Sequence, residues 1–377
     1  MAGIKLLTII SIFIVITIFG FSNIITSSSA QSIPAYISTR DHFDKITGEL
    51  KQQQNNSTNY SISGIIPGLN GKCTNEIPIY IHGVWTRPEF PSFSFDSSNF
   101  FHIGFENALE IFDRADKSLK EENYPFDVVG FSWDSDTISP TNAWDIAKLI
   151  AKNNGLKLGQ AILDIKKNCQ QMDIRIIAHS LGARVALNAL DYLNKNRDWN
   201  DNNFRITSVH LMGAAVDDEE VSKDPNDILI DTTNLDTNKI KSAFGKAIEN
   251  EVVRFYNLFN PEDDVLGPTK TFMPIIYTAN EKDSALGKNG KQNGIDLPTN
   301  YNDTNVSNKI NKIRDADGDG FVDFGWYSIP MYTLKFGDNH FGYVGFRDFI
   351  FGFAGRGPLD NSGAMSVVVA DWKKVEN

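Results

Sequence analysis

The segment Asp173–Ala186 constrains this chain more than any other stretch. Its first half is a short apolar run of the length that a buried strand needs. From Leu181 onward, apolar residues recur at helical spacing, namely Leu181, Val185, Ala186 and Leu190. A strand is therefore predicted to turn into a helix at Ser180. Ala178 and Gly182 lie two positions to either side, where small residues let the two backbones meet. This pattern is that of a nucleophile elbow, with Ala in its first position.

The composition sets the class of molecule. The chain has 377 residues, of which 41% are hydrophobic and 11% aromatic, which is typical of a globular protein with a large core. The formal net charge is -11, and the Lys and Arg residues form no cluster. Because phosphate neutralisation needs clustered cations, we expect no nucleic-acid partner.

Strands and helices alternate on both sides of the elbow. Strands are expected at Ile77–Trp85, Phe126–Trp133, Ile206–Val216 and Val252–Phe259, and helices at Phe105–Leu119 and Ala143–Leu163. We expect Val252–Phe259 to be the last parallel strand. This order predicts an α/β fold with a mostly parallel central sheet, right-handed crossovers and helices on both faces.

The elbow Ala178-His179-Ser180-Leu181-Gly182 resembles that of the α/β-hydrolase superfamily, in particular its lipase and esterase branch. The resemblance covers roughly residues 77–353, apart from an insertion at residues 267–330. It implies that Ser180 is a nucleophile. It also implies that the strand ending in His82-Gly83 leads into half of an oxyanion hole, whose donors would be the backbone N–H groups of Val84 and Leu181.

The same resemblance implies an acid and a histidine downstream. The acid belongs on the loop after Val252–Phe259, where Asp263 fits an Asp-x-Val-Leu pattern and Asp264 is the reserve candidate. His340 follows the acid on a turn-prone loop. The resulting order of Ser180, Asp263 and His340 is the α/β-hydrolase order.

Other polar residues receive structural interpretations. The run Asp217–Glu220 is expected to be a solvated loop, although Asp217 and Asp218 are further reserve candidates for the acid. His210 precedes the acid, and we expect it to be a strand histidine with a satisfied hydrogen bond rather than a catalytic group.

The N-terminus has the pattern of a targeting segment. Lys5 precedes the apolar run Leu6–Phe21, and Ser28-Ser29-Ala30 offers small residues for cleavage, so residues 1–30 are predicted to be a signal peptide. An uncleaved membrane anchor is the alternative. Residues 31–71 are expected to form a polar segment or linker, in which Tyr60–Ile66 could add an edge strand. The hydrolase domain is expected over residues 72–377.

Two further features agree with a secreted or cell-surface location. Cys73 and Cys169 precede two strands that would be neighbours in a hydrolase sheet, so they either form a disulfide or remain as two buried thiols. Glycosylation acceptor triplets begin at Asn55, Asn56, Asn59, Asn302 and Asn305.

An insertion over residues 267–330 separates the acid from the histidine. Within it, residues 315–326 match most of a calcium loop. The oxygen donors Asp315, Asp317, Asp319 and Asp323, the turn residue Gly320 and the carbonyl of Phe321 occupy their usual positions. Trp326 replaces the bidentate Glu at position twelve. We expect either a structural calcium ion or an acidic loop without metal.

These features together predict an extracytoplasmic serine hydrolase of the esterase or lipase type. The expected substrate is a small-molecule or lipid ester, and no organic cofactor is implied. The N-terminal segment could add an attachment to the membrane. The alternative is a catalytically inactive hydrolase fold that serves as a calcium-binding adhesion protein at the cell surface.

Calcium binding has a direct test. If residues 315–326 hold calcium, a chelator lowers the midpoint of thermal unfolding by a few degrees, because a ligand that binds only the native state stabilises it. Excess calcium restores the midpoint, and Asp317→Ala removes the response. The hypothesis is wrong if neither the chelator nor this substitution changes thermal unfolding.

Overall fold

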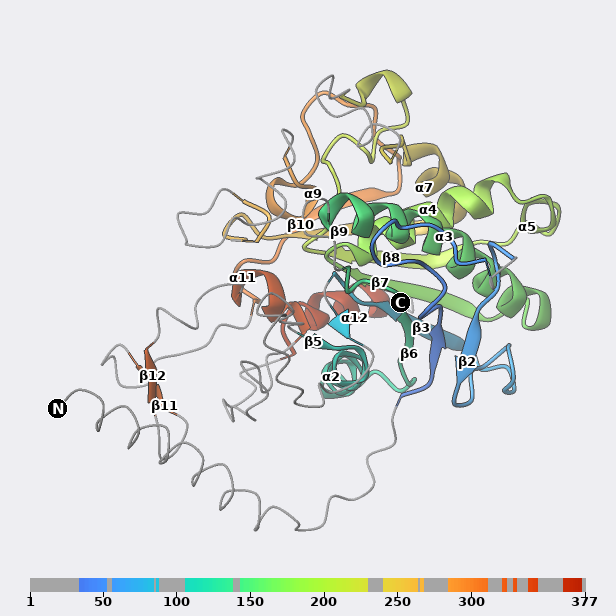
Figure 1. Ribbon diagram of the computed structural model, residues 1–377, viewed down its shortest axis with the longest axis horizontal. Helices are drawn as coiled ribbons and strands as arrows, with labels where there is room; N and C mark the ends of the chain where they lie inside the picture. The colour runs from blue at the N-terminus through green and yellow to red at the C-terminus, as the bar shows by residue number, and fades with distance from the viewer. Residues whose placement is uncertain are drawn as a thin grey trace, which may run out of the picture. The chain divides into compact units, whose positions relative to one another are not determined.

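An eight-stranded sheet forms the centre of the computed structural model, in the order β10-β9-β8-β7-β3-β6-β1-β2 (Figure 1). Its strands are β1 (Tyr36–Ser38), β2 (Ser61–Ser63), β3 (Glu76–Ile81), β6 (Val129–Ser132), β7 (Asp173–His179), β8 (Ile206–Met212), β9 (Val252–Phe259) and β10 (Tyr301–Asn305). Every neighbouring pair is parallel except β1 and β2, which are antiparallel. The mostly parallel sheet predicted from the sequence is confirmed.

The structure describes residues 34–52, 56–84, 86–87, 106–137, 143–229, 240–263, 265–267, 284–310, 321–323, 328–330, 338–344 and 362–374. The predicted signal segment, residues 1–30, lies outside them. The described helices are α2 (Ala108–Glu121), α3 (Ala143–Asn168), α4 (Gly182–Lys195), α5 (Arg197–Asp201), α7 (Gly245–Glu251), α9 (Leu286–Asn289), α11 (Asp338–Phe341) and α12 (Met365–Lys373). None of them is both long and apolar enough to cross a membrane.

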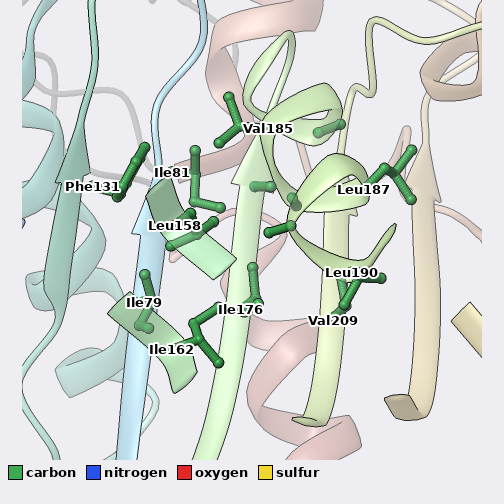
Figure 2. Close-up of a cluster of buried hydrophobic side chains, with 14 of the residues drawn as sticks. Ile79, Ile81, Phe131, Leu158, Ile162, Ile176, Val185, Leu187, Leu190 and Val209 are labelled. Atoms are coloured by element: carbon green, nitrogen blue, oxygen red, sulfur yellow. The ribbon is translucent and has the colours of Figure 1, made fainter. Parts of the chain in front are cut away.

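Helices cover both faces of the sheet because the central strands alternate their apolar side chains between the two sides. On one face, Ile79 of β3 and Ile176 of β7 pack in a cluster with side chains of α3 and α4 (Figure 2). On the other face, Tyr80 and Ile177 belong to a second cluster with residues of α2 and α12. The elbow helix α4 and its neighbour α3 therefore pack side by side on the first of these faces of the sheet.

The segment before residue 72 is part of the sheet and does not act as a linker. β1 pairs in parallel with β6, and β2, which lies within the expected edge strand, closes this side of the sheet. Ile37 and Ile66 are fully buried. Phe43 is buried as well, although Ile46 and Ile65 are exposed, so a low average hydrophobicity conceals the few residues that face the core.

The sheet also continues beyond β9, which corrects the expectation that β9 is the last parallel strand. β10 lies within the insertion and pairs in parallel with β9. Its sequence, Tyr-Asn-Asp-Thr-Asn, has no apolar alternation. Specific contacts hold it instead: Tyr301 stacks on Phe255 at 5.6 Å between ring centroids, and Asn257 donates a 2.9 Å hydrogen bond to Asp303.

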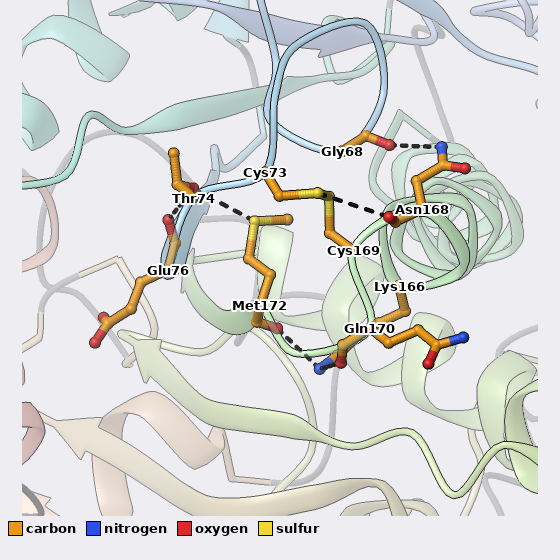
Figure 3. The surroundings of a disulfide bond; sticks show 9 residues. All are labelled: Gly68, Cys73, Thr74, Glu76, Lys166, Asn168, Cys169, Gln170 and Met172. Carbon is orange, nitrogen blue, oxygen red and sulfur yellow. Dashed lines mark hydrogen bonds between the residues drawn. A yellow bond between two sulfur atoms is a disulfide. The ribbon is translucent and has the colours of Figure 1, made fainter.

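Cys73 and Cys169 form a disulfide, which decides between the two alternatives that the sequence left open (Figure 3). The bond joins the segment before β3 to the residue after α3, and β3 and β7 are neighbours as expected. Close by, Asn168 donates a 2.7 Å hydrogen bond to the Gly68 carbonyl. The disulfide thus fastens the N-terminal part of the chain to the central strands.

We expect the disulfide to contribute substantially to stability. It closes a loop with a sequence separation of 96 residues, and loss of such a cross-link costs about 2–5 kcal/mol in the free energy of unfolding. Urea unfolding of the Cys73→Ser/Cys169→Ser double variant measures this difference. Wild-type protein unfolded with and without a reductant is the matched control, and equal midpoints in all cases would contradict the prediction.

Candidate active site

Ser180 occupies a strained turn between β7 and α4. Its φ angle is +54°, in the left-handed region, where a non-glycine residue costs about 1–3 kcal/mol. Hydrogen bonds to neighbouring segments hold the turn. The Ser180 N–H donates to the Met212 carbonyl at 2.9 Å, and the Ser180 carbonyl accepts from the N–H groups of Ala183 and Ala215, each at 3.1 Å.

Gly182 lets α4 begin directly against β3. A Cβ atom at this position would lie 2.6 Å from the His82 carbonyl oxygen and 2.7 Å from that of Ile81. Distances this short require the backbone to move. Ala178, on the other side of the turn, is paired in register with Ile81 of β3. The small residues that flank Ser180 therefore allow close contact with the neighbouring strand.

The structure brings Ser180, His340 and Asp263 together, although they are far apart in the sequence. His340 Nε2 lies 2.8 Å from Ser180 Oγ, and His340 Nδ1 lies 2.7 Å from Asp263 Oδ2. All three side chains are buried, with exposed fractions of 4% for Ser180, 1% for His340 and 0% for Asp263. This chain of hydrogen bonds is the arrangement that activates a serine hydroxyl.

Backbone groups orient the Asp263 carboxylate. Its Oδ1 accepts hydrogen bonds from the N–H groups of Val265 at 3.0 Å and Leu266 at 2.9 Å, which leaves Oδ2 for His340. The reserve candidate Asp264 lies outside the described residues. Asn260 donates a 2.9 Å hydrogen bond to the Asn339 carbonyl, so the acid loop is tied directly to α11, which carries the histidine.

The end of β3 lies against the elbow, as an oxyanion hole requires. A Cβ atom on Gly83 would lie 2.8 Å from Ser180 Cβ and 3.3 Å from Ser180 Oγ. Within the described residues, neither the Val84 N–H nor the Leu181 N–H donates a hydrogen bond. Both backbone donors are therefore available to a negatively charged oxygen next to Ser180.

His179 is a neighbour of the site that the sequence analysis did not single out. Its Nε2 lies 2.7 Å from the His340 carbonyl oxygen, and the centroids of the two rings are 4.8 Å apart. Burial, followed by the nearby His340, lowers the pKa of His179 to about 3. The ring is thus neutral at ordinary pH and donates Nε2–H to that carbonyl. In the sequence, its position directly before Ser180 in the elbow was the one signal that could have placed it near the site.

The run Asp217–Glu220 is buried, which corrects the expectation of a solvated loop. All four side chains are at most 8% exposed. Arg184, on α4, forms an ion pair of 2.6 Å with Glu220, and Lys241 lies 2.8 Å from Asp217. The carboxylates remain buried because cations from other segments pair with them. This loop supports the elbow helix, and its Asp217, a reserve candidate for the acid, pairs with Lys241 while Asp263 contacts His340.

His210 lies within β8, as expected, but the part of the chain that the structure describes supplies no hydrogen-bond partner for either ring nitrogen. Its Nε2 is 3.5 Å from Asp371 of α12. The ring instead stacks on Tyr256, with 4.6 Å between centroids.

The calcium loop falls mostly outside the described residues, including Asp315, Asp317 and Asp319. Phe321 and Asp323 belong to β11 (Phe321–Asp323), which pairs antiparallel with β12 (Ser328–Pro330). Across the described part of the chain, no group of three or more His, Cys, Asp or Glu residues is arranged to hold a metal ion.

The sheet, the helices on both faces and the elbow define an α/β-hydrolase fold. A family model described as an alpha/beta hydrolase of unknown function (DUF900) matches residues 100–260. The matched span includes the elbow and ends just before Asp263.

The other comparisons add little. Among solved structures, an acetyl xylan esterase matches with 9% sequence identity, over 48% of this chain and 83% of that chain, at a TM-score of 0.23. A likeness this slight carries no argument about the substrate. No curated protein matches the sequence.

The strain at Ser180 predicts an unusual difference between two substitutions. Both Ser180→Ala and Ser180→Gly remove the hydroxyl, but only glycine adopts a φ of +54° without cost. We therefore expect Ser180→Gly to be more stable than Ser180→Ala by about 1 kcal/mol in the free energy of unfolding. Urea unfolding of the two variants measures the difference, and an Ala variant as stable as the Gly variant would show that the turn is unstrained.

Proposed function

We propose that this protein is an extracytoplasmic serine hydrolase that cleaves carboxylic esters. The observation that carries the proposal is the unbroken hydrogen-bond chain from Ser180 through His340 to Asp263. The expected substrates are small-molecule or lipid esters of moderately apolar acyl groups. Neither an organic cofactor nor a nucleic-acid partner is needed for this chemistry.

In the acylation step, Ser180 Oγ attacks the ester carbonyl carbon while His340 Nε2 takes the hydroxyl proton. The carbonyl electron pair moves to oxygen, and the N–H groups of Val84 and Leu181 stabilise the resulting oxyanion. When the tetrahedral intermediate collapses, His340 returns the proton to the departing alcohol. Asp263 holds the imidazole in the tautomer that this transfer needs.

Water completes the cycle. His340 removes a proton from a water molecule, whose oxygen attacks the acyl-enzyme carbonyl and forms a second oxyanion. Collapse of this intermediate breaks the bond to Ser180 Oγ, which recovers its proton from His340 as the carboxylic acid leaves. Each proton thus passes through the same nitrogen of His340.

The geometry favours an active enzyme over an inactive adhesion protein of the same fold. A left-handed φ at a serine is costly, and such strain persists at sites where function requires it. The backbone N–H groups of Val84 and Leu181, next to Ser180, donate no hydrogen bond within the described residues. An adhesion role would need neither feature.

Several features support a secreted or cell-surface location. Disulfides persist in oxidising compartments, and the bond between Cys73 and Cys169 is of the structural kind. Of the acceptor triplets, those at Asn302 and Asn305 present exposed side chains on the edge strand β10. We propose that the N-terminal segment directs export, with attachment to the membrane as a further role, and that calcium, if bound near Asp323, is structural.

The nucleophile is tested by labelling with a fluorophosphonate probe. We expect one equivalent of label per chain, attached at Ser180, and no labelling of Ser180→Ala or His340→Ala. A series of p-nitrophenyl esters of increasing acyl length then defines the preferred chain. Folded wild-type protein that neither labels nor hydrolyses any of these esters would exclude the proposed function and leave the adhesion alternative.

The acid is tested with two neighbouring carboxylates. We expect Asp263→Asn to lower kcat about 10³- to 10⁴-fold, because the amide no longer favours the productive tautomer of His340. Asp264→Asn is the matched control, since it removes the same charge one residue away, and its kcat should stay within about twofold of wild type. The assignment is wrong if the two variants behave alike or in the reverse order.

A further inference from the structure

The His82 side chain contacts the peptide bond that carries one of the two oxyanion donors. His82 Nδ1 lies 2.8 Å from the carbonyl oxygen of Gly83, whose peptide bond supplies the Val84 N–H. We infer that His82 is a positioning residue for hydrolysis: it locks the Gly83–Val84 peptide in the orientation that presents this N–H to the oxyanion, and Arg40 locks His82. This inference rests on the proposed function.

The contacts of the His82 ring determine which nitrogen carries the proton. Nε2 faces two donors, the Arg40 guanidinium at 3.1 Å and the Trp133 backbone N–H at 3.2 Å, so this nitrogen must accept. The proton is therefore on Nδ1, which donates it to the Gly83 carbonyl. Burial, together with the Arg40 charge, holds the pKa of His82 well below its usual range, so the ring stays neutral.

The anchored carbonyl fixes the direction of the N–H. The Gly83 oxygen also accepts a 3.2 Å hydrogen bond from the Thr86 hydroxyl, so two donors hold it on one side. In a planar trans peptide the C=O and N–H point in opposite directions, and none of the described peptide bonds is cis. Val84 N–H therefore points away from His82. If the peptide flipped, its carbonyl would face the oxyanion and repel it.

Arg40, which belongs to the N-terminal part of the chain, holds the His82 ring in place. Its guanidinium donates to Ser132 Oγ at 2.9 Å and to the Thr86 carbonyl at 2.9 Å, and it pairs with Asp136 at 3.2 Å. The ring of His82 is also stacked on Trp133, at 5.6 Å between centroids and 5° between planes. The buried ring has little freedom to turn, so its hydrogen bond to Gly83 is maintained.

Two amide substitutions at His82 separate positioning from simple structural support. His82→Asn places an amide near the position of Nδ1 and keeps a donor for the Gly83 carbonyl. His82→Gln places the amide near the position of Nε2, so it keeps the contact with Arg40 and loses that donor. We expect His82→Gln to lower kcat about 10- to 100-fold with KM within about twofold of wild type, since the lost interaction acts in the transition state. His82→Asn should keep kcat within about fivefold.

A spectroscopic measurement reports on the peptide itself without relying on activity. Gly83-Val84 is the single Gly-Val pair in the sequence. Protein labelled with carbonyl-¹³C glycine and ¹⁵N valine therefore gives one HNCO cross-peak, from this peptide. We expect the peak to shift or broaden in His82→Gln and to stay near the wild-type position in His82→Asn. A boronic acid that forms a tetrahedral adduct should move the Val84 amide proton downfield in wild type.

Thr86→Val provides a second route if a His82 variant does not fold, because it removes the other donor to the same carbonyl. We expect the same cross-peak to shift and kcat to fall by a smaller factor than in His82→Gln. Unchanged cross-peaks, or equal effects of Asn and Gln on kcat, would overturn the inference. The cross-peaks could respond as expected while the fluorophosphonate probe fails to label Ser180 of the wild type. In that case His82 does orient the Gly83–Val84 peptide, and the proposed function is wrong.

Discussion

The left-handed turn at Ser180 is the constraint on which the rest of the site depends. It persists because segments on both sides hold it: β8 accepts the Ser180 N–H, and β3 comes so close that only glycine fits at position 182. The strain, about 1–3 kcal/mol, is therefore offset by the assembled sheet and not by local sequence. Ser180 acquires its geometry only when β3, β7 and β8 are in register.

The other two members of the hydrogen-bond chain depend on contacts between distant loops. Asp263 can direct one oxygen to His340 because two backbone N–H groups hold its other oxygen. His179 and Asn260 each hold a backbone carbonyl in α11, so the histidine is fixed through its main chain as well as its ring. Full burial then makes these hydrogen bonds stronger than they would be in water.

Buried charges explain where expectations from the sequence differ from the structure. The run Asp217–Glu220 and the segment around Arg40 are polar in sequence, and a polar pattern ordinarily indicates solvated surface. The acidic run is buried and Arg40 is half-buried, because each pairs with a charge from elsewhere in the chain: Arg184 with Glu220, and Arg40 with Asp136. β10 was missed for a related reason, since hydrogen bonds and one ring stack replace the apolar alternation that would reveal a strand.

The sequence by itself determined the alternation of strands and helices, the elbow at Ser180 and the order of Ser180, Asp263 and His340, because local periodicity and short motifs encode these features. It could not determine the position of β10, the burial of the acidic run or the roles of His82, His179 and Arg40. Only the tertiary structure decided these, since each depends on which distant groups meet. The elbow was visible as a pattern of small residues, but its strained φ exists only because two neighbouring strands close around it.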